Sequence, residues 1–341
     1  MRAALLRWFD LHKRDLPWRG QRDPYAIWVS EIMLQQTQVS TVIPYYRRFL
    51  KRFPTVRALS AAALADVLGQ WKGLGYYSRA RNLHRAAQAI VAEHGGELPR
   101  TAAGLRELPG FGRYTSGAVA SIAFGEEAPI VDGNVARVLS RVRAIEGLPG
   151  DKAREQRLWA EAAELVKGER PGTLNEALME LGATVCLPKA PLCLLCPVSA
   201  HCVALKTGRV DELPPAKVRT ARKRLELAVA VCRRRDRLLL ARRPDAGLFG
   251  GLWELPTAPT PDGLAKLLGG TVGERLATIE RTLTHRDLVL DVFPLETRKK
   301  LDRLDGYTEC RWVTKAELEP LGMATAMQAV LGHAWSEGTR G

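Results

Sequence analysis

Four of the six cysteines in this 341-residue chain lie in one short segment, in the pattern Cys-x6-Cys-x2-Cys-x5-Cys. They are Cys186, Cys193, Cys196 and Cys202. A scattered thiol behaves as a small buried hydrophobe, but four thiols this close together, with prolines bending the chain around them, favour one shared metal ion or cluster. The segment therefore predicts a metal site that fixes a loop.

Disulfide bonds are an alternative use of these cysteines. Arg2, Arg7 and Asp10 interrupt the apolar residues at the N-terminus, so we expect no export signal there and reduced thiols. The expected location is the bacterial cytoplasm, at the nucleoid, or another reducing intracellular compartment. Structural zinc with four thiolates usually shows two separated Cys-x2-Cys pairs, whereas loops of unequal length suit a cubane iron–sulfur cluster. We favour a [4Fe-4S] cluster, with zinc as the alternative.

The charge balance indicates the kind of partner. Lys and Arg number 51 against 37 Asp and Glu, which gives a net charge of +14 and points to an anionic polymer such as nucleic acid. Charge alone is weak evidence, because many basic proteins never bind nucleic acid. No apolar run approaches a membrane span, so we expect no membrane partner.

The length suggests two domains, and the chain changes character after the cysteines. Residues 1–207 read as helical segments with short turns, among them 59–75 and 76–96, and predict an all-α domain. Residues 208–224 are rich in proline and cations and predict a linker. Residues 225–341 predict an α+β domain. We expect a β-hairpin of 225–232 and 237–244, strands over 288–296 and 310–315, and a last helix near 323–334.

Residues 108–124 (LPGFGRYTSGAVASIAF) follow a short helix that Thr101 is expected to cap. Gly110 and Gly112 end that helix, and small residues beyond them let a second helix pack closely, which is the pattern of a helix-hairpin-helix. Such a turn exposes backbone amides that can hold a phosphate without reading a base, so we expect Gly110, Gly112 and Arg113 to contact DNA. An ordinary helical turn with a glycine cap is the alternative.

Two carboxylates are candidates for catalysis. Asp132 precedes a helix, where it can act as an N-cap and where the helix dipole and amide donors favour its ionised form. Glu31 has apolar helical neighbours that would desolvate it and raise its pKa, although an isolated glutamate is more often solvated. Carboxyl groups with opposite tendencies separate an acid from a charge stabiliser in glycosidic cleavage.

Five segments in this order resemble adenine DNA glycosylases of the MutY type. They are SEIMLQQTQV, GLGYYSRARNLH, LPGFGRYTSGAV, VDGNV and the cysteine pattern. The resemblance covers nearly the whole chain. The helix-hairpin-helix, the following aspartate and the cysteine loop are shared with the wider endonuclease III superfamily. The QQTQ segment and the additional C-terminal domain carry the more specific likeness, which implies a monomeric enzyme that removes adenine opposite 8-oxoguanine, or guanine, in double-stranded DNA.

The resemblance implies roles for the catalytic residues. Glu31 would protonate the departing adenine at N7, and Asp132 would stabilise the oxocarbenium-like sugar or trap it covalently before water attacks. Tyr114 occupies the position at which strand-nicking relatives carry a Schiff-base lysine, so it would support the intermediate without forming that adduct. Asn134 would orient catalytic groups or water, although it is also a suitable residue for a helix start.

The resemblance also implies contacts with the DNA. Trp18, Arg19 and Glu176 match positions that line the pocket for the flipped adenine. Two residues would insert near the lesion pair and two would meet phosphates. The inserted residues are Gln36 and Tyr76, and the phosphate contacts are Arg79 and Arg81. Taken singly, a core aromatic for Tyr76 and a solvated helix face for the arginines are the better interpretations of these positions. Gly73 and Gly75, however, favour an exposed turn over a core position.

The C-terminal domain resembles the MutT-like, Nudix-fold domain that this family uses to recognise 8-oxoguanine. Residues 247–256 (GLFGGLWELP) resemble the early strands of that fold. The acidic Nudix box is absent, so we expect binding without nucleotide hydrolysis. The family's Phe-Ser-His loop reads Leu283-Thr284-His285 here, which retains the hydroxyl and the imidazole but not the aromatic wedge. A plain surface turn is the alternative.

Two other functions fit parts of the sequence. A thymine or uracil mismatch glycosylase could share this scaffold, in which case the residues of the base pocket would differ in what they bind. A non-catalytic DNA-damage binder would lack one of the two carboxylates, and Glu31 and Asp132 are both present.

Overall fold

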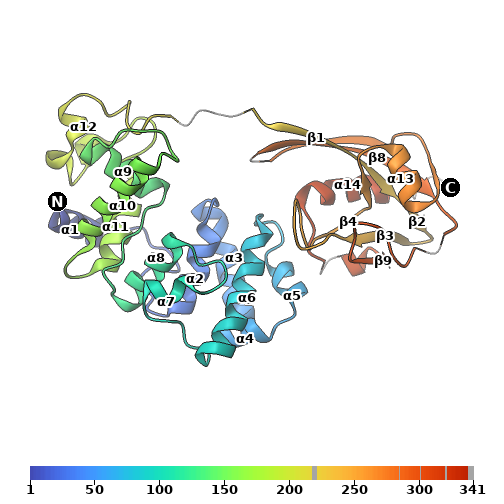
Figure 1. The fold of residues 1–341 in the computed structure, drawn as a ribbon, viewed down its shortest axis with the longest axis horizontal. Helices are drawn as coiled ribbons and strands as arrows, with labels where there is room; N and C mark the ends of the chain where they lie inside the picture. Colours follow the sequence, from blue (N-terminus) through green and yellow to red (C-terminus); the bar gives the residue numbers. More distant parts are fainter. Residues whose placement is uncertain (217–220, 284, 300, 319–320, 337–341) are drawn as a thin grey trace. The chain divides into compact units, whose positions relative to one another are not determined.

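The computed structural model describes residues 1–216, 221–283, 285–299, 301–318 and 321–336. By their contacts they form two compact units, Met1–Ala61 with Asn82–Arg219, and Ala62–Arg81 with Thr220–Gly341 (Figure 1). The predicted division, an all-α part followed by an α+β part, is confirmed in fold class. The segment Ala62–Arg81 groups with the C-terminal residues although it is helical. Among the described residues no helix has the length and apolar character needed to cross a bilayer.

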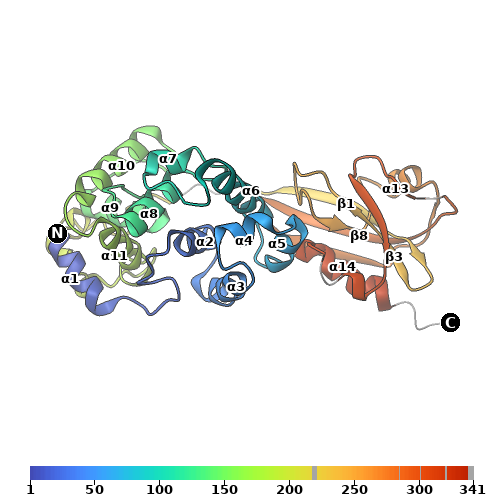
Figure 2. The same cartoon turned by 90° about the horizontal axis from the view of Figure 1, so that it is seen from below.

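The first unit is built of helices. They are α1 (Arg2–His12), α2 (Pro24–Leu34), α3 (Val39–Arg52), α4 (Val56–Ala61), most of α6 (Tyr77–His94), α7 (Ala102–Arg106), α8 (Arg113–Phe124), α9 (Gly133–Arg143), α10 (Lys152–Val166), α11 (Pro171–Thr184), the short 3-10 turns Cys193–Leu195 and Ser199–His201, and α12 (Val203–Lys206). One core joins α1, α8, α9, α10 and α11, around side chains such as Leu5, Val138 and Leu178. Figure 2 shows the same helices from below.

The helix-hairpin-helix forms as predicted between α7 and α8. The Thr101 side chain accepts a hydrogen bond from the Gly104 amide and so caps α7. Gly110 has a φ of +79°, and a Cβ there would lie 2.6 Å from Cβ of Asn82, so this turn requires glycine for both reasons. A Cβ at Gly117 would lie 2.4 Å from the Pro129 carbonyl oxygen. The small residues therefore allow α8 to pack closely, as the sequence indicated.

Residues 59–75 do not form the single helical segment that the periodicity suggested. The chain turns after α4 and again begins a helix at α5 (Leu64–Gln70). Residues 71–76 then form a tight turn in which Gly73 and Gly75 have positive φ angles. This exposed turn precedes α6, as the glycines predicted.

The second unit contains two sheets. The strands are β1 (Lys223–Val231), β2 (Arg233–Arg234), β3 (Arg237–Arg242), β4 (Trp253–Glu254), β5 (Thr257–Ala258), β6 (Thr271–Val272), β7 (Ala277–Thr282), β8 (Arg286–Glu296) and β9 (Glu309–Val313). The strand order is β5-β1-β8-β6 in the first sheet, with β7 also on β8, and β2-β3-β4 in the second, with β9 on β3. In the C-terminal part of this unit the α-helices among the described residues are α13 (Pro261–Leu268) and α14 (Thr325–Ser336).

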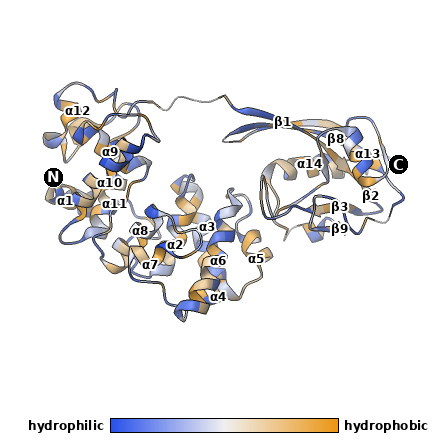
Figure 3. Cartoon of the chain, viewed as in Figure 1, coloured by the Kyte–Doolittle hydropathy of each residue, from blue (hydrophilic) through white to orange (hydrophobic). Residues whose placement is uncertain are grey.

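Alternation along β1 explains how the two helices cover this sheet. Val229 and Val231 pack with residues of α14 such as Met327, while Ala228 and Ala230 pack with residues of α13 such as Leu264. The first residues of β1 are hydrophilic (Figure 3), and the first two are exposed. The sheet therefore lies between α13 and α14.

The predicted strands 288–296 and 310–315 and the last helix are confirmed as β8, β9 and α14. The predicted hairpin of 225–232 with 237–244 is wrong in its pairing. The turn at Arg235 joins only the short β2 to β3, whereas β1 runs parallel to β8 over its whole length. Hydrophobic alternation identifies a strand but not its partner, because the same pattern fits either sheet. Residues 247–256 contribute only the two-residue strand β4.

Candidate active site

Glu31 lies on α2, which begins at the N-cap Asp23 and Pro24. It is 5% exposed, so the interpretation as a solvated glutamate is wrong. Burial raises the pKa of Glu31 to about 7, against a lowering by the Tyr114 hydrogen bond, and the charge of Asp132 raises it further. A substantial fraction of this carboxyl is therefore protonated near neutral pH. This is the state that a general acid needs.

Tyr114 lies in the first turn of α8 and faces the same carboxyl. Its hydroxyl donates to Oε2 of Glu31 at 2.7 Å, and the hydroxyl oxygen lies 3.1 Å from Sδ of Met179. Burial and the nearby negative charges of Glu31 and Asp132 raise the pKa of the phenol well above its usual value. Tyr114 therefore remains a neutral donor. It fixes the orientation of the carboxyl without supplying a charge.

Asp132 caps the N-terminus of α9, as predicted. Its Oδ1 accepts from the Val135 amide at 2.7 Å, and its Oδ2 lies 3.3 Å from Nδ2 of Asn134. Asn134 is held in turn by Arg137, whose NH2 group donates to its Oδ1 at 2.8 Å. The amide donors lower the pKa of Asp132 as expected, but burial is the larger influence and the net pKa is raised. The expected effect of the donors is thus present, and the burial of Asp132, which was not predicted, sets the net direction of the pKa shift.

Trp18, Arg19 and Glu176 lie together in the same unit. Trp18 is buried and contacts the Tyr46 ring edge-on with ring centroids 5.4 Å apart. Nε of Arg19 lies 3.5 Å from Oε1 of Glu176. The charges of Arg19 and Glu176 both act on Glu31, Glu176 raising and Arg19 lowering its pKa, so these two residues lie close to the Glu31 carboxyl.

The sequence reasoning missed Glu180. This carboxylate lies one helical turn after Glu176 on α11, is 1% exposed, and accepts from NH2 of Arg19 at 2.6 Å. The signal that could have found it is the i, i+4 spacing of two glutamates on a helix whose other residues are mostly apolar.

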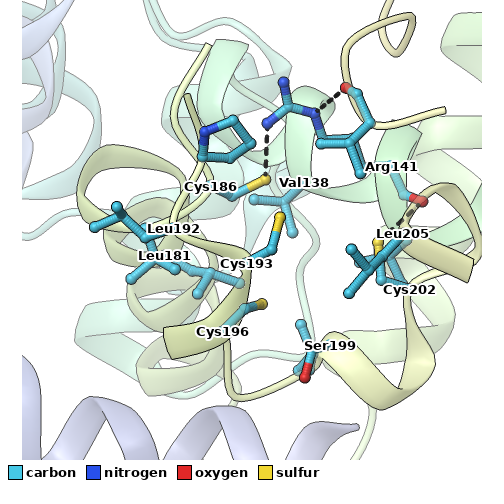
Figure 4. A pocket seen from close by; sticks show the side chains of 15 residues that line it. Val138, Arg141, Leu181, Cys186, Leu192, Cys193, Cys196, Ser199, Cys202 and Leu205 are labelled. Carbon is cyan, nitrogen blue, oxygen red and sulfur yellow. Dashed lines mark hydrogen bonds between the residues drawn. The ribbon is translucent and has the colours of Figure 1, made fainter. Parts of the chain in front are cut away.

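The four cysteines line one pocket with an empty volume of about 390 Å³, part of it open to solvent (Figure 4). All six cysteines of the chain are free thiols in the structure. Among the described residues, no three His, Cys, Asp or Glu side chains are grouped in a way that would hold a single metal ion. The four thiols therefore line one common space.

Two arginines of α9, also missed from the sequence, adjoin the cysteine loop. Arg141 is 3% exposed, and its NH1 group lies 3.4 Å from Sγ of Cys186 (Figure 4). The same group donates to the Leu187 carbonyl at 2.7 Å. Arg137 donates to the Cys186 carbonyl at 2.8 Å as well as to Asn134. Helix α9, which begins after Asp132, is therefore linked to the cysteine loop by the hydrogen bonds of Arg137 and Arg141.

The residues predicted to insert into DNA have unusual backbones. Gln36, between α2 and α3, has a φ of 57°, and Tyr76 has a φ of 50°. Non-glycine residues in this left-handed region are uncommon and gather at functional sites. Tyr76 is 41% exposed, which excludes a core position for its ring.

The two arginines after Tyr76 are engaged within their own unit. Arg79 is 8% exposed, its NH2 group donates to the Gly75 carbonyl at 3.1 Å, and its guanidinium lies over the rings of Trp71 and Tyr76. The polar end of Arg79 therefore supports the turn that presents Tyr76, and its contact with a phosphate remains a prediction. Arg81 donates to the Gly250 carbonyl. Its use for phosphate remains a prediction.

At the helix-hairpin-helix, Gly112 is the N-cap of α8 and a Cβ there would meet open space. Because glycine has no side chain, Gly112 makes no side-chain hydrogen bond to the first backbone amides of α8. Arg113 is exposed, and its guanidinium lies 3.8 Å from the centre of the Trp159 ring. The charge of Arg106 contributes to lowering the Arg113 pKa, after burial, so two cations lie near this turn. This arrangement suits an anionic ligand such as a phosphate.

The Leu283-Thr284-His285 segment joins β7 to β8. The Leu283 amide donates to the Arg286 carbonyl at 2.8 Å, and Leu283 packs partly against the core of its unit. His285 is exposed, and Thr284 lies outside the described residues. Leu283 is thus partly engaged in the core, while His285 is open to a ligand.

Comparison with known proteins agrees with this geometry. Residues 29–164 match the family model of HhH-GPD superfamily base excision DNA repair proteins, and residues 228–333 match that of the NUDIX domain. The helical unit is similar to a solved thermostable thymine-DNA glycosylase, at 30% identity and a TM-score of 0.55 over 60% of this chain and 95% of that one. It shares its fold with endonuclease III in a trapped DNA complex, at 23% identity and a TM-score of 0.51 over 61% and 96% of the two chains.

The class is thus a base excision DNA N-glycosylase with a C-terminal Nudix-like α+β domain. A closer relative defines the family. The human adenine DNA glycosylase is 40% identical in a match that covers 96% of this chain and 73% of the human protein. The rat adenine DNA glycosylase is 38% identical over all of this chain and 78% of its own length. This chain belongs to the adenine DNA glycosylase family.

Proposed function

We propose that the protein removes adenine mispaired with 8-oxoguanine, or with guanine, from double-stranded DNA by hydrolysing the N-glycosidic bond. The observation that carries this proposal is the buried Glu31 carboxyl. Its pKa is raised to about 7 and its Oε2 is held at 2.7 Å by Tyr114, close enough to Asp132 for the two charges to interact. One carboxyl is ready to give a proton and the other is supplied with N–H donors, which is the pairing that glycosidic cleavage requires.

In this mechanism the adenine leaves the duplex and enters the pocket beside Trp18, Arg19 and Glu176. Glu31 donates its proton to N7 of the base, so that adenine leaves as a neutral molecule. The bond between the sugar and the base then breaks, and positive charge develops on the sugar. Asp132 stabilises that charge or traps the sugar until water attacks.

Tyr114 and Asn134 support these two steps in different ways. Tyr114 holds the Glu31 carboxyl and carries no amine, so the enzyme forms no Schiff base and does not nick the strand. Asn134 is fixed by Arg137 and lies beside Asp132, where it orients the carboxylate or the attacking water.

The cysteine pocket fits a [4Fe-4S] cluster better than zinc. A single zinc ion needs thiolates that converge at one centre, whereas a cubane needs one thiolate at each of four separated corners. The four cysteines surround a common space, and the buried Arg141 beside Cys186 supplies positive charge next to thiolates. A bound cluster would supply a rigid cross-link that orders the loop. Such a site requires reduced thiols, so we place the protein in a reducing intracellular compartment.

The Nudix-like domain would recognise the oxidised guanine through the turn at Leu283 and His285. The exposed imidazole of His285 supports this role. Leu283 is partly packed against its own core, so direct recognition is expected to depend on His285 more than on an inserted side chain.

The test uses duplexes that differ at one base pair. The protein is incubated with adenine opposite 8-oxoguanine, adenine opposite guanine, thymine opposite guanine, uracil opposite guanine and undamaged DNA, at one fixed salt concentration. We expect free adenine and an intact strand with an abasic site, fastest opposite 8-oxoguanine. Release of thymine or uracil would replace this proposal by that of a mismatch glycosylase of the same class, and binding without release of any base would leave a damage binder.

A further inference from the structure

Glu180 has no part in the mechanism above, yet it is among the most buried charged residues of the described chain. It is 1% exposed and lies on α11 in the layer between α1 and α8. An unpaired carboxylate in such a position would be strongly destabilising. A charged Glu180 at this buried position therefore requires hydrogen-bond donors and positive charge close to its carboxylate.

Two arginines provide these partners. Arg14 donates to Glu180 through Nε at 2.6 Å, through NH2 at 3.0 Å and through its backbone amide at 3.2 Å. Arg19 donates through NH2 at 2.6 Å. Burial alone would raise the pKa of Glu180, but the bonds from Arg14 and the charge of Arg19 outweigh it and lower that pKa. The carboxylate is therefore charged and rigidly held.

The guanidinium of Arg19 is clamped on three sides. Glu180 holds NH2, Glu176 lies 3.5 Å from Nε, and the Phe9 ring lies under the plane at 4.8 Å. The remaining nitrogen, NH1, is buried and has no hydrogen-bond partner among the described residues. A buried donor without an acceptor is costly, and such donors are rare in native proteins, where a functional role or a bound water or ion accounts for them.

We propose that Glu180 is a positioning residue for base recognition, which holds Arg19 so that its NH1 group donates to an acceptor atom on the edge of the flipped base. This inference rests on the proposed function, since it takes the space beside Arg19 and Glu176 as the base pocket. Glu180 lies one helical turn after Glu176, so both carboxylates point to the same side of α11. Glu180 acts only through Arg19.

The test compares single-turnover excision of adenine, affinity for the lesion duplex and thermal unfolding in Glu180→Gln and in the wild type. Glutamine retains the shape but loses the charge that fixes Arg19. We expect excision to fall roughly 10- to 100-fold, the range for loss of one hydrogen bond to a charged group, while the affinity for DNA stays within about twofold because phosphate contacts remain. Glu161→Gln is the matched control. It breaks an exposed pair with Arg143 at 2.9 Å and should leave excision unchanged.

A double-mutant cycle separates positioning from general stability. If Glu180 works through Arg19, the variant carrying both Glu180→Gln and Arg19→Gln should be no slower than Arg19→Gln alone. Multiplicative losses, or excision and affinity falling together with the melting temperature, would overturn the inference. Should Glu180→Gln fail to fold, Glu180→Asp decides the matter, since it keeps the buried charge but withdraws it from Arg19 and should slow excision with DNA affinity unchanged. If the wild type excises adenine and the Glu180 variants are equally active, this inference is wrong and the proposed function stands. If the wild type releases no adenine, the proposed function itself is wrong.

Discussion

The Glu31→Gln substitution should stabilise the protein at alkaline pH while it abolishes excision. The folded protein raises the pKa of Glu31 to about 7, from an ordinary value of 4.5. The folded state therefore binds this proton more tightly than the unfolded chain does. The stabilisation that results is fully present below pH 4.5 and is lost as the pH rises from 4.5 through 7. At higher pH Glu31 is a buried, ionised carboxylate, which lowers the free energy of unfolding relative to acidic pH.

The size of the effect follows from the two pKa values. Their difference of roughly 2.5, at about 1.36 kcal/mol for each pKa unit, corresponds to about 3 kcal/mol at pH 8. Glutamine has nearly the same shape as glutamate, and its amide oxygen can still accept from Tyr114. The substitution should therefore cost at most about 1 kcal/mol through the altered hydrogen bond, at every pH.

The assay is urea unfolding of the wild type and of Glu31→Gln at intervals from pH 4.5 to 8.5, followed by tryptophan fluorescence. The free energy of unfolding of the variant, minus that of the wild type, should grow by about 3 kcal/mol across this range. Glu161→Gln, which alters only an exposed ion pair, serves as the control. A difference that stays constant with pH would show that Glu31 does not titrate near neutrality in the folded protein.

The same carboxyl should set the pH dependence of catalysis in the wild type. If excision needs the protonated form of Glu31, the single-turnover rate should fall about tenfold for each pH unit well above 7. A rate that is flat from pH 6 to 9 would contradict the assignment of Glu31 as the acid, even if the stability curves behave as expected.

Four further substitutions test the remaining assignments. Asp132→Asn keeps the cap but removes the charge, so adenine release should drop by at least about 1000-fold in single-turnover assays while the lesion duplex still binds in a gel-shift assay. Tyr114→Lys places an amine beside the Glu31 carboxyl, and borohydride should then trap a protein–DNA adduct; a variant that excises adenine but gives no adduct would show that this side chain does not face the sugar. Cys193→Ser should lower the folding yield and the DNA affinity together, and the wild type should contain about four irons per chain, whereas stoichiometric zinc would disprove the cluster. His285→Ala should reduce the preference for adenine opposite 8-oxoguanine over adenine opposite guanine at fixed salt, and an unchanged preference would move recognition of the oxidised base elsewhere.

Local signals in the sequence were sufficient to predict where the helices and the turn around the candidate site begin. The capping residues Thr101 and Asp132 mark helix starts that the structure reproduces, since an N-cap is set by its own side chain and the next few amides. Gly110 likewise marks its turn, because only glycine combines that φ with so close a neighbour. These features depend on residues adjacent in the chain.

Features that depend on distant residues could not be predicted in the same way. The pairing of β1 with β8 joins residues more than fifty positions apart, and nothing in either strand distinguishes that partner from β3. Arg79 reads as an exposed cation on a helix, yet its guanidinium lies within the turn before α6. The burial of Glu180 beside Arg14 and Arg19 brings together residues from opposite ends of the helical unit. A long polar side chain thus reveals little of its role until its partners are placed.

The two carboxyls to which the proposed mechanism assigns the chemistry show how one environment can give two chemical roles. Burial raises the pKa of both Glu31 and Asp132, so depth alone does not distinguish them. Their donors do. Asp132 accepts hydrogen bonds from a backbone amide and a side-chain amide at the start of a helix, and these favour the anion. Glu31 accepts one hydrogen bond, from the Tyr114 phenol, at a buried position. The backbone of α9 therefore favours the charged form of Asp132, whereas Glu31, whose hydrogen bond among the described residues comes from Tyr114, is the residue that holds the proton.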